Sequence, residues 1–260
     1  MKEERGVCMK VARRVLFLSV VAIATAAAVG QPWSTESFTS ALKSMWATID
    51  STAPAATPLD PSETGNVIAD LLDHAHVVDS LPNVPGYERG CKRGQACSFG
   101  PAWNDPQNHS GCDTRSRILQ AQLTDVTVKP NTHNCKVLSG TLHDPYTGQI
   151  IAYDAGRDPS AVQLDHVFAL GRSWDAGASL WDEAKRVALA NDPVNLFAVS
   201  GPANRDKSDS GLEWLPPNRD FQCTYIARYL AVAVTYDLNI TTNDRDIAVR
   251  QCPATTGGAT

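Results

Sequence analysis

Hydrophobic and polar positions follow two different periods along the chain, and together these predict a mixed fold. Apolar residues at helical spacing predict helices over residues 31–50, 65–73, 112–123, 173–192 and 223–238. Alternation of apolar and polar residues predicts strands over 124–129, 161–170 and 195–200. Residues 137–153 are expected to form a hairpin whose turn, DPYTG (144–148), has no further role.

The strand predicted over residues 195–200 should run directly into another helix. Ser200 is a good N-cap residue, and Pro202 is tolerated in the first turn of a helix. Gly211 can end this helix. The chain is therefore expected to be an α+β protein with a mostly helical main domain.

The first 30 residues have the composition of an export signal. Lys10, Arg13 and Arg14 precede the uncharged run VLFLSVVAIATAAAVG, which ends in small residues. This order is typical of a secretory signal peptide, so we expect cleavage near residues 28–30 and no stable membrane span afterwards. An uncleaved anchor is the alternative, although about 16 apolar residues fall short of the roughly 20 that a span prefers.

The rest of the chain divides into three predicted regions. Residues 31–80 are expected to hold N-terminal helices and a linker rich in Pro, Ala and Thr. Residues 81–252 should form the single main domain, and residues 253–260 a disordered tail. Whether translation starts at Met1 or at Met9 stays open.

The cysteines fit an exported protein. Six remain after the signal segment, an even number that points to disulfides in an oxidising compartment. Fifteen pairings are compatible with six cysteines, and proximity in sequence favours Cys91–Cys97, Cys112–Cys135 and Cys223–Cys252. A structural zinc site is the alternative, but the spacings do not supply the two C-x2-4-C pairs that it needs.

The charge of the chain argues against a static nucleic-acid-binding protein. The formal net charge is −5, and loss of residues 1–30 removes five Lys or Arg but only two Glu. Tight nucleic-acid binders are usually basic, because phosphate contacts supply most of their affinity. An enzyme that contacts a few phosphates in one cleft is not excluded.

Residues suited to catalysis and metal binding occur in LDHVFAL (164–170) and in NLFAVSGPANRDKSD, which begins at residue 195. The carboxylate of Asp165 and the amide oxygen of Asn204 are hard donors, suited to one Mg²⁺ or Mn²⁺ ion that keeps water and substrate phosphate in its other positions. An unperturbed histidine has a pKa of about 6.5, so His166 is expected to act as a general base that takes a proton from an attacking water at neutral pH.

Three further residues can complete such a site. Asn195 lies where a second strand would pass beside His166, so we expect it to orient the imidazole. Lys207 and Arg205 can meet negative charge that builds on a phosphate. Asp165 and His166 can line one pocket only if their strand ends or bends there, because neighbouring residues on a continuing strand point to opposite faces.

These residues resemble the HNH (His-Me finger, ββα-metal) endonucleases, and within them the GmrSD-type exported proteins. The resemblance covers about residues 83–252, includes the upstream GCDTRSRIL and the late CTY, and rests on five ordered motifs at Asp165–His166, Trp174–Ala178, Asn191–Leu196, Asn204–Asp209 and Trp214–Pro217. In one respect the chain departs from the family, because many members carry His where this chain has Asn204. An amide at that position favours a hard ion over zinc.

The resemblance implies a ββα-metal core in which His166 is the general base, Asp165 and Asn204 bind the metal, and Asn195 orients the histidine. It implies a secreted or cell-envelope endonuclease that hydrolyses DNA, or RNA, with little sequence preference, acts as a monomer, and has nucleic acid as its partner. A third hypothesis is that the protein is a toxin with an inhibitor or immunity protein as its partner. The alternative from another class is a non-catalytic cell-envelope binding protein that keeps the fold.

Overall fold

The computed structural model describes residues 61–254. The predicted signal peptide, the predicted helix over 31–50 and most of the predicted linker lie outside the described residues, as does most of the predicted tail. Across the described residues, no helix combines the length and apolar character needed to cross a membrane.

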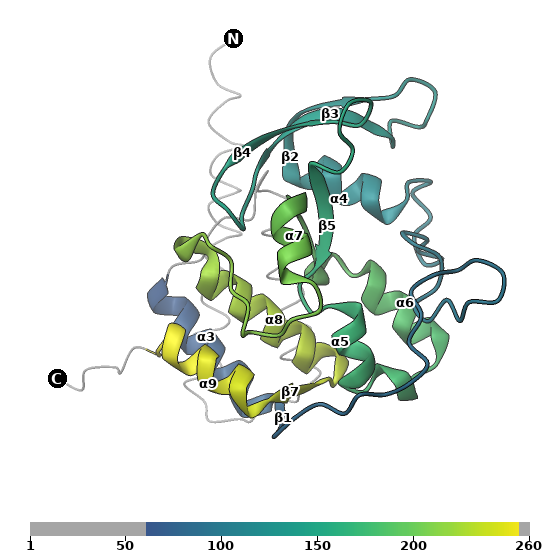
Figure 1. Cartoon of the computed structure of the whole chain (residues 1–260). Helices are drawn as coiled ribbons and strands as arrows, with labels where there is room; N and C mark the ends of the chain where they lie inside the picture. Colours follow the sequence, from purple (N-terminus) through teal and green to yellow (C-terminus); the bar gives the residue numbers. More distant parts are fainter. Residues whose placement is uncertain (1–60, 255–260) are drawn as a thin grey trace, which may run out of the picture. The chain divides into compact units, whose positions relative to one another are not determined.

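The described chain consists of helices and short strands, with four strands in succession between α4 and α5 (Figure 1). Their order is α3 (Pro61–His74), β1 (His76–Val78), α4 (Thr114–Gln122), β2 (Leu123–Val128), β3 (Val137–His143), β4 (Ile150–Asp154), β5 (Val162–His166), α5 (Leu170–Asp175), η1 (Ala178–Leu180), α6 (Glu183–Asn191), η2 (Pro193–Asn195), β6 (Leu196–Ser200), α7 (Gly201–Lys207), η3 (Arg219–Phe221), α8 (Gln222–Tyr236), β7 (Asn239–Thr241) and α9 (Thr242–Gln251).

The strands form three small sheets. β1 pairs with β7 in parallel, β2, β3 and β4 form an antiparallel sheet, and β5 pairs with β6 antiparallel. The expected hairpin is confirmed as β3 and β4, with the DPYTG turn between them. The described residues therefore form a mixed α/β fold, as the sequence pattern predicts.

The β5–β6 pair and α7 position the residues of chemical interest. Val162 pairs with Ser200 at one end of this two-stranded sheet, and His166 pairs with Leu196 at the other. The Ser200 hydroxyl accepts a hydrogen bond from the Ala203 amide, so β6 turns directly into α7 at the predicted N-cap. Two antiparallel strands are thus followed by a helix that packs on both of them.

Helix α8 forms the centre of the packing. Eleven of its fifteen residues are buried, which agrees with the long apolar helix expected over 223–238. It packs against α3 and α9. Buried Tyr225 and Tyr229 point toward the segment that follows β5, where Phe168 stacks on Tyr229 with ring centroids 4.5 Å apart.

The structure corrects the helix predicted over residues 173–192. This stretch contains α5, the short 3-10 helix η1 and α6 instead of one continuous helix. Gly177 adopts φ 134°, far from the negative φ that a right-handed helix needs, so α5 cannot continue through it. Glycine adopts this conformation more readily than residues with side chains. Asp182 then caps a new helix by accepting a hydrogen bond from the Lys185 amide.

Other boundaries differ from the prediction. β5 ends at His166, four residues earlier than expected, and α7 ends at Lys207 before the predicted stop at Gly211. Ser208 follows α7 with φ 52°, so the helix cannot continue. α3 begins at Pro61, inside the predicted linker. Helix α9 was not expected, although Thr241 and Asp244 form a capping box at its start.

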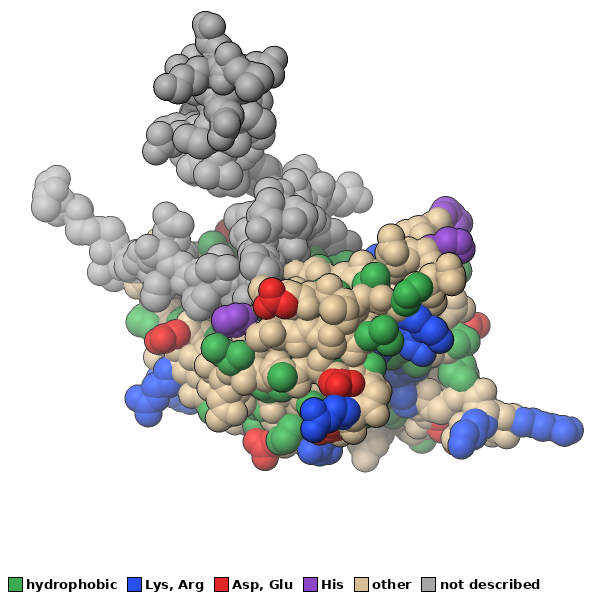
Figure 2. Space-filling view, turned by 90° about the horizontal axis from the view of Figure 1, so that it is seen from above, with side chains coloured by type: hydrophobic (Ala, Val, Ile, Leu, Met, Phe, Trp, Pro, Cys, Tyr) green, Lys and Arg blue, Asp and Glu red, His purple; other side chains and the backbone are tan. Residues whose placement is uncertain are grey.

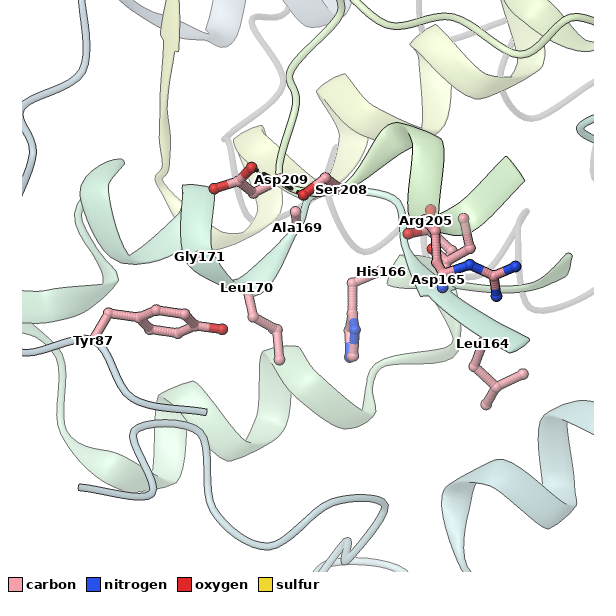
Figure 3. A pocket seen from close by; sticks show the side chains of 11 residues that line it. Tyr87, Leu164, Asp165, His166, Ala169, Leu170, Gly171, Arg205, Ser208 and Asp209 are labelled. Carbon is pink, nitrogen blue, oxygen red and sulfur yellow. Dashed lines mark hydrogen bonds between the residues drawn. The ribbon is translucent and has the colours of Figure 1, made fainter. Parts of the chain in front are cut away.

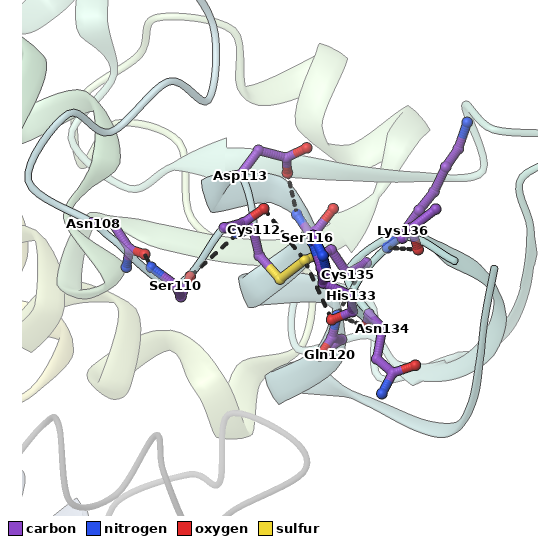
Figure 4. The surroundings of a disulfide bond; sticks show 12 residues. Asn108, Ser110, Cys112, Asp113, Ser116, Gln120, His133, Asn134, Cys135 and Lys136 are labelled. Atoms are coloured by element: carbon purple, nitrogen blue, oxygen red, sulfur yellow. Dashed lines mark hydrogen bonds between the residues drawn. A yellow bond between two sulfur atoms is a disulfide. The ribbon is translucent and has the colours of Figure 1, made fainter. Parts of the chain in front are cut away.

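The three expected disulfides are confirmed. Cys91–Cys97 closes a short exposed loop, and Cys223–Cys252 joins the start of α8 to the end of α9. Cys112–Cys135 ties the segment before α4 to the loop between β2 and β3 (Figure 4). Asp113 beside this bridge caps α4 by accepting from the Ser116 amide, so the bridge fixes the start of that helix.

Candidate active site

A cleft of about 500 Å³ lies where β5, α5 and α7 meet (Figure 3). Asp165, His166, Asn204 and Arg205 line it, so four of the predicted site residues come together in one place. Asp165 and His166 are the last two residues of β5, and Asn204 and Arg205 lie on α7. β5 ends where the sequence argument required it to end, since neighbours on a continuing strand would face opposite sides.

The His166 imidazole is fixed by two contacts. Its Nε2–H donates to the carbonyl oxygen of Ala190, at the end of α6, over 2.9 Å. The indole of Trp103 stacks on the ring with centroids 5.6 Å apart and planes 4° from parallel. A carbonyl can only accept, so this bond selects the tautomer with Nδ1 unprotonated. Within the described residues, Nδ1 has no hydrogen-bond partner.

The environment of His166 favours the neutral imidazole. Burial lowers the pKa of His166 to about 4, and the positive charges of Arg89 and Lys207 lower it further, against the opposing effect of the Ala190 hydrogen bond. The ring is therefore a neutral base at pH 7.

The side chain of Asn195 makes no hydrogen bond to the imidazole within the described residues, which corrects the role expected for it. Its side chain is fully buried, with Oδ1 accepting from the Phe168 amide at 2.8 Å and Nδ2 donating to the Phe168 carbonyl at 3.2 Å. The Asn195 carbonyl accepts from the Val167 amide. Asn195 therefore holds the backbone immediately after His166, and the Ala190 carbonyl is the group that orients the ring.

Asp165 is 4% exposed and has two strong partners. The ammonium of Lys207 lies 2.9 Å from Oδ1, and the hydroxyl of Tyr146 donates a short hydrogen bond to Oδ2. Burial raises the pKa of Asp165, while Lys207 and Tyr146 lower it. Burial beside Asp165 also raises the pKa of Tyr146 well above its ordinary value, so the phenol stays a donor.

The structure thus contradicts the expectation that the DPYTG turn has no further role. Tyr146 is 0% exposed and reaches Asp165 from the β3–β4 turn. Asp144 of the same turn accepts a hydrogen bond from the Ser200 amide, at the junction of β6 and α7. A bulky aromatic residue within a polar turn was the sequence signal that could have revealed this contact.

Lys207 lies on the predicted helix, but its side chain does not line the cleft, where it was expected to meet a phosphate. Its side chain is 0% exposed, and Nζ donates to Asp165 Oδ1 and to the His166 carbonyl at 2.8 Å. A buried ammonium with these partners cannot contact a phosphate in the cleft. Lys207 is therefore a positioning residue, which ties the end of β5 to the last turn of α7.

Asn204 and Arg205 face the cleft differently. The Nδ2 of half-buried Asn204 donates to Gln163 Oε1 at 2.9 Å, which directs the amide. Within the described residues, Asn204 Oδ1 has no hydrogen-bond partner and is left as an oxygen donor. Arg205 is exposed on the cleft wall, so it is the predicted cation that can meet an anionic substrate.

The oxygen donors of the cleft fit a hard divalent ion in type. Each oxygen of Asp165 accepts one hydrogen bond, and a carboxylate has lone pairs for more. Asn204 Oδ1 supplies a second oxygen. The adjacent Lys207 ammonium offsets the charge of Asp165, which weakens its attraction for a cation. In residues 61–254 no group of three or more His, Cys, Asp or Glu side chains is placed to hold a metal ion.

Comparison with known proteins assigns this chain to a protein family. The family model of the GmrSD restriction endonucleases, C-terminal domain, matches residues 113–247, just over half of the sequence. The chain belongs to this family. The matched region includes β5, β6 and α7, and it begins after Tyr87, Arg89 and Trp103, which all lie near the cleft.

A curated fungal protein is similar over a comparable length of the chain. An uncharacterized secreted protein of Arthroderma benhamiae is 35% identical over 137 residues, which is 52% of this chain and 63% of that protein. This chain therefore spans less than two thirds of the length of its relative. No solved structure matches the chain.

Proposed function

We propose that this protein is an exported, divalent-metal-dependent endonuclease that hydrolyses phosphodiester bonds in DNA, or RNA, with little sequence preference. The observation that carries the proposal is the orientation of His166. The Ala190 carbonyl accepts a hydrogen bond from Nε2–H, so Nδ1 is unprotonated and can accept a proton. His166 lines the same cleft as Asp165 and Asn204. Membership of a restriction endonuclease family supports a nuclease-related role.

In this mechanism His166 acts as the general base. The unprotonated Nδ1 accepts a proton from a water molecule that attacks the phosphorus atom. The Ala190 carbonyl stabilises the imidazolium that forms, because it accepts a hydrogen bond from the opposite nitrogen. The stacked indole of Trp103 keeps the ring plane fixed during this transfer.

Asp165 and Asn204 would hold the divalent ion, Mg²⁺ or Mn²⁺, through one carboxylate and one amide oxygen. When bound, such an ion supplies charge stabilisation for the phosphate and for the leaving oxygen. Tyr146 and Lys207 fix the Asp165 carboxylate, and Gln163 directs the Asn204 amide. Both ligands are thus oriented in advance by their neighbours.

Arg205 contacts the substrate phosphate in this proposal, because it is exposed on the cleft wall. On the face shown in Figure 2, Lys and Arg side chains lie scattered among Asp and Glu instead of forming one large patch. With a net charge of −5, this distribution suits an enzyme that binds its polymer transiently and weakly at physiological salt.

Export is supported by three disulfides and by the secreted relative. Disulfides persist in oxidising compartments and are rare in the cytosol. The basic and apolar N-terminal segment agrees with this location. We therefore propose that the enzyme acts outside the cytoplasm, in the cell envelope or the medium.

Plasmid nicking tests the proposal directly. The purified protein should nick supercoiled DNA with Mg²⁺ or Mn²⁺, and excess EDTA should abolish this. His166→Ala should lower the rate by about 10²–10⁴-fold, the usual contribution of a general base. His143→Ala is the matched control, because His143 is exposed on β3 and does not line the cleft. Equal nicking by His166→Ala and the wild type would disprove the mechanism.

A further inference from the structure

One end of the cleft contains groups that the proposed mechanism does not use. Tyr87 comes from the loop before α4, Gly171 from α5, and Asp209 from the residues after α7 (Figure 3). A Cβ placed on Gly171 would lie 3.5 Å from Tyr87 Cε1 and 3.7 Å from Asp209 Oδ2. Gly171 therefore separates a phenol from a carboxylate and leaves the space between them open. We call these three residues the Tyr87 corner.

Tyr87 is held rigidly, and its hydroxyl is available. Its ring packs edge-on against Phe99, with centroids 6.1 Å apart, and at a tilt against Trp174, with centroids 6.2 Å apart. The hydroxyl points toward Leu170, another residue that lines the cleft (Figure 3). It has no hydrogen-bond partner in the part of the chain that the structure describes. Burial raises the pKa of Tyr87, so the group is a neutral donor at pH 7.

Asp209 supplies the complementary acceptor. It is exposed, and its Oδ1 accepts only a long hydrogen bond of 3.3 Å from the neighbouring Ser208 hydroxyl. A carboxylate repels a phosphate, whereas it accepts well from a hydroxyl or an amino group. Asp209 is therefore suited to an uncharged donor, whereas Arg205 is suited to phosphate. The positive charge of Arg89 also acts on Tyr87, and it offsets part of the charge of Asp209 at this end of the cleft.

We propose that the Tyr87 corner binds the nucleoside part of a nucleotide next to the scissile phosphate. Asp209 accepts from a base amino group or, in RNA, from the ribose 2′-hydroxyl, and the Tyr87 hydroxyl donates to an acceptor on the same nucleoside. This inference rests on the proposed nuclease function and adds a subsite to it. Tyr87 lies outside the region matched by the family model, so the subsite draws on a segment beyond that model.

The test measures binding without catalysis. Fluorescence anisotropy of labelled single-stranded oligonucleotides is followed in EDTA and physiological salt, with His166→Ala as the parent protein. Tyr87→Phe and Asp209→Ala should each weaken binding by about 3- to 10-fold, as expected for loss of one hydrogen bond. Gly171→Ala should weaken it too, because the added methyl group fills the corner, and alanine is favoured over glycine in a helix. Tyr153→Phe is the control, since this buried tyrosine does not line the cleft.

Salt dependence separates the corner from the phosphate contact. Arg205→Gln should reduce the slope of log K against log salt by about one, because one phosphate contact is lost. Tyr87→Phe should leave the slope unchanged. An abasic RNA oligonucleotide identifies the moiety, because the Asp209→Ala loss disappears on it if the base is bound and persists if the ribose 2′-hydroxyl is bound.

Two results would overturn the subsite. Tighter binding by Asp209→Ala would mean that Asp209 only repels phosphate, and unchanged binding by both Tyr87→Phe and Asp209→Ala would leave the corner without a role. Either result with a parent protein that binds oligonucleotides normally would leave the nuclease proposal intact. Both proposals would be overturned if the His166→Ala parent did not bind oligonucleotides and the wild-type protein did not nick DNA.

Discussion

The ammonium of Lys207 lies 2.9 Å from Asp165 Oδ1, and neither side chain is more than 4% exposed. This buried ion pair joins the last turn of α7 to the end of β5, and it gives the pocket a carboxylate whose position is fixed. Tyr146 completes the arrangement from the β3–β4 turn. Asp165 is thus held by two partners, Lys207 and Tyr146, whose side chains are themselves fully buried.

Removal of Lys207 should destabilise the fold strongly. Lys207→Met leaves Asp165 buried without its counter-charge, and breaking a buried pair in this way costs about 3–5 kcal/mol. Urea unfolding followed by circular dichroism measures the loss. The double variant Lys207→Met with Asp165→Asn should recover a large part of it, because the stranded charge is gone. A loss below about 1 kcal/mol in the single variant would show that the pair is not buried in solution.

Tyr146→Phe should reduce both stability and activity. It removes only the hydroxyl that donates to Asp165 Oδ2, and loss of a hydrogen bond to a buried charged group costs about 1.5–3 kcal/mol. Nicking should slow because the carboxylate is no longer fixed. Tyr225→Phe is the matched control, since this equally buried phenol makes only a 3.5 Å contact with the Val167 carbonyl. Equal effects of the two substitutions would contradict a specific role for Tyr146.

The sequence predicted those parts of the site that local signals determine. Alternation marked β5 and β6, and Ser200 marked the start of α7, so Asp165, His166 and Asn204 were placed on the correct elements. Proximity in sequence was enough to pair the cysteines, because each bridge closes a short loop.

The partners of these residues could not be predicted, because tertiary contacts bring them in. The group that orients His166 is the Ala190 carbonyl, and a backbone carbonyl has no sequence signature. Trp103 and Tyr146 reach the site from loops far along the chain. Lys207 was expected to meet the charge of a phosphate. Lysine is seldom buried, and only the pairing with Asp165 makes its burial favourable.

The disulfides should differ in their effect on stability. Cys223–Cys252 spans 29 residues and Cys91–Cys97 spans six, so loop-closure entropy predicts stabilisation of about 3.5 and about 2 kcal/mol. Replacing each pair by serine and measuring the unfolding free energy checks this order. The Cys223–Cys252 bridge also joins α8 to α9, so its removal should speed the hydrogen exchange of the backbone amides of α9. The reverse order of stabilities would contradict the argument.

The acid limb of the nuclease pH profile should lie unusually low. The neutral imidazole is the base, and the pKa of His166 is about 4, so activity falls only as the pH drops through 4 and the ring becomes protonated. At pH 5.5 more than about 90% of His166 should be neutral, against roughly 10% for an ordinary histidine. Measuring kcat/KM from pH 3.5 to 8 tests this. Trp103→Leu uncovers one face of the ring and should move the limb toward 6.5, while His143→Ala should not. A wild-type limb near 6.5 would mean that His166 is solvated in solution and that burial does not set its protonation.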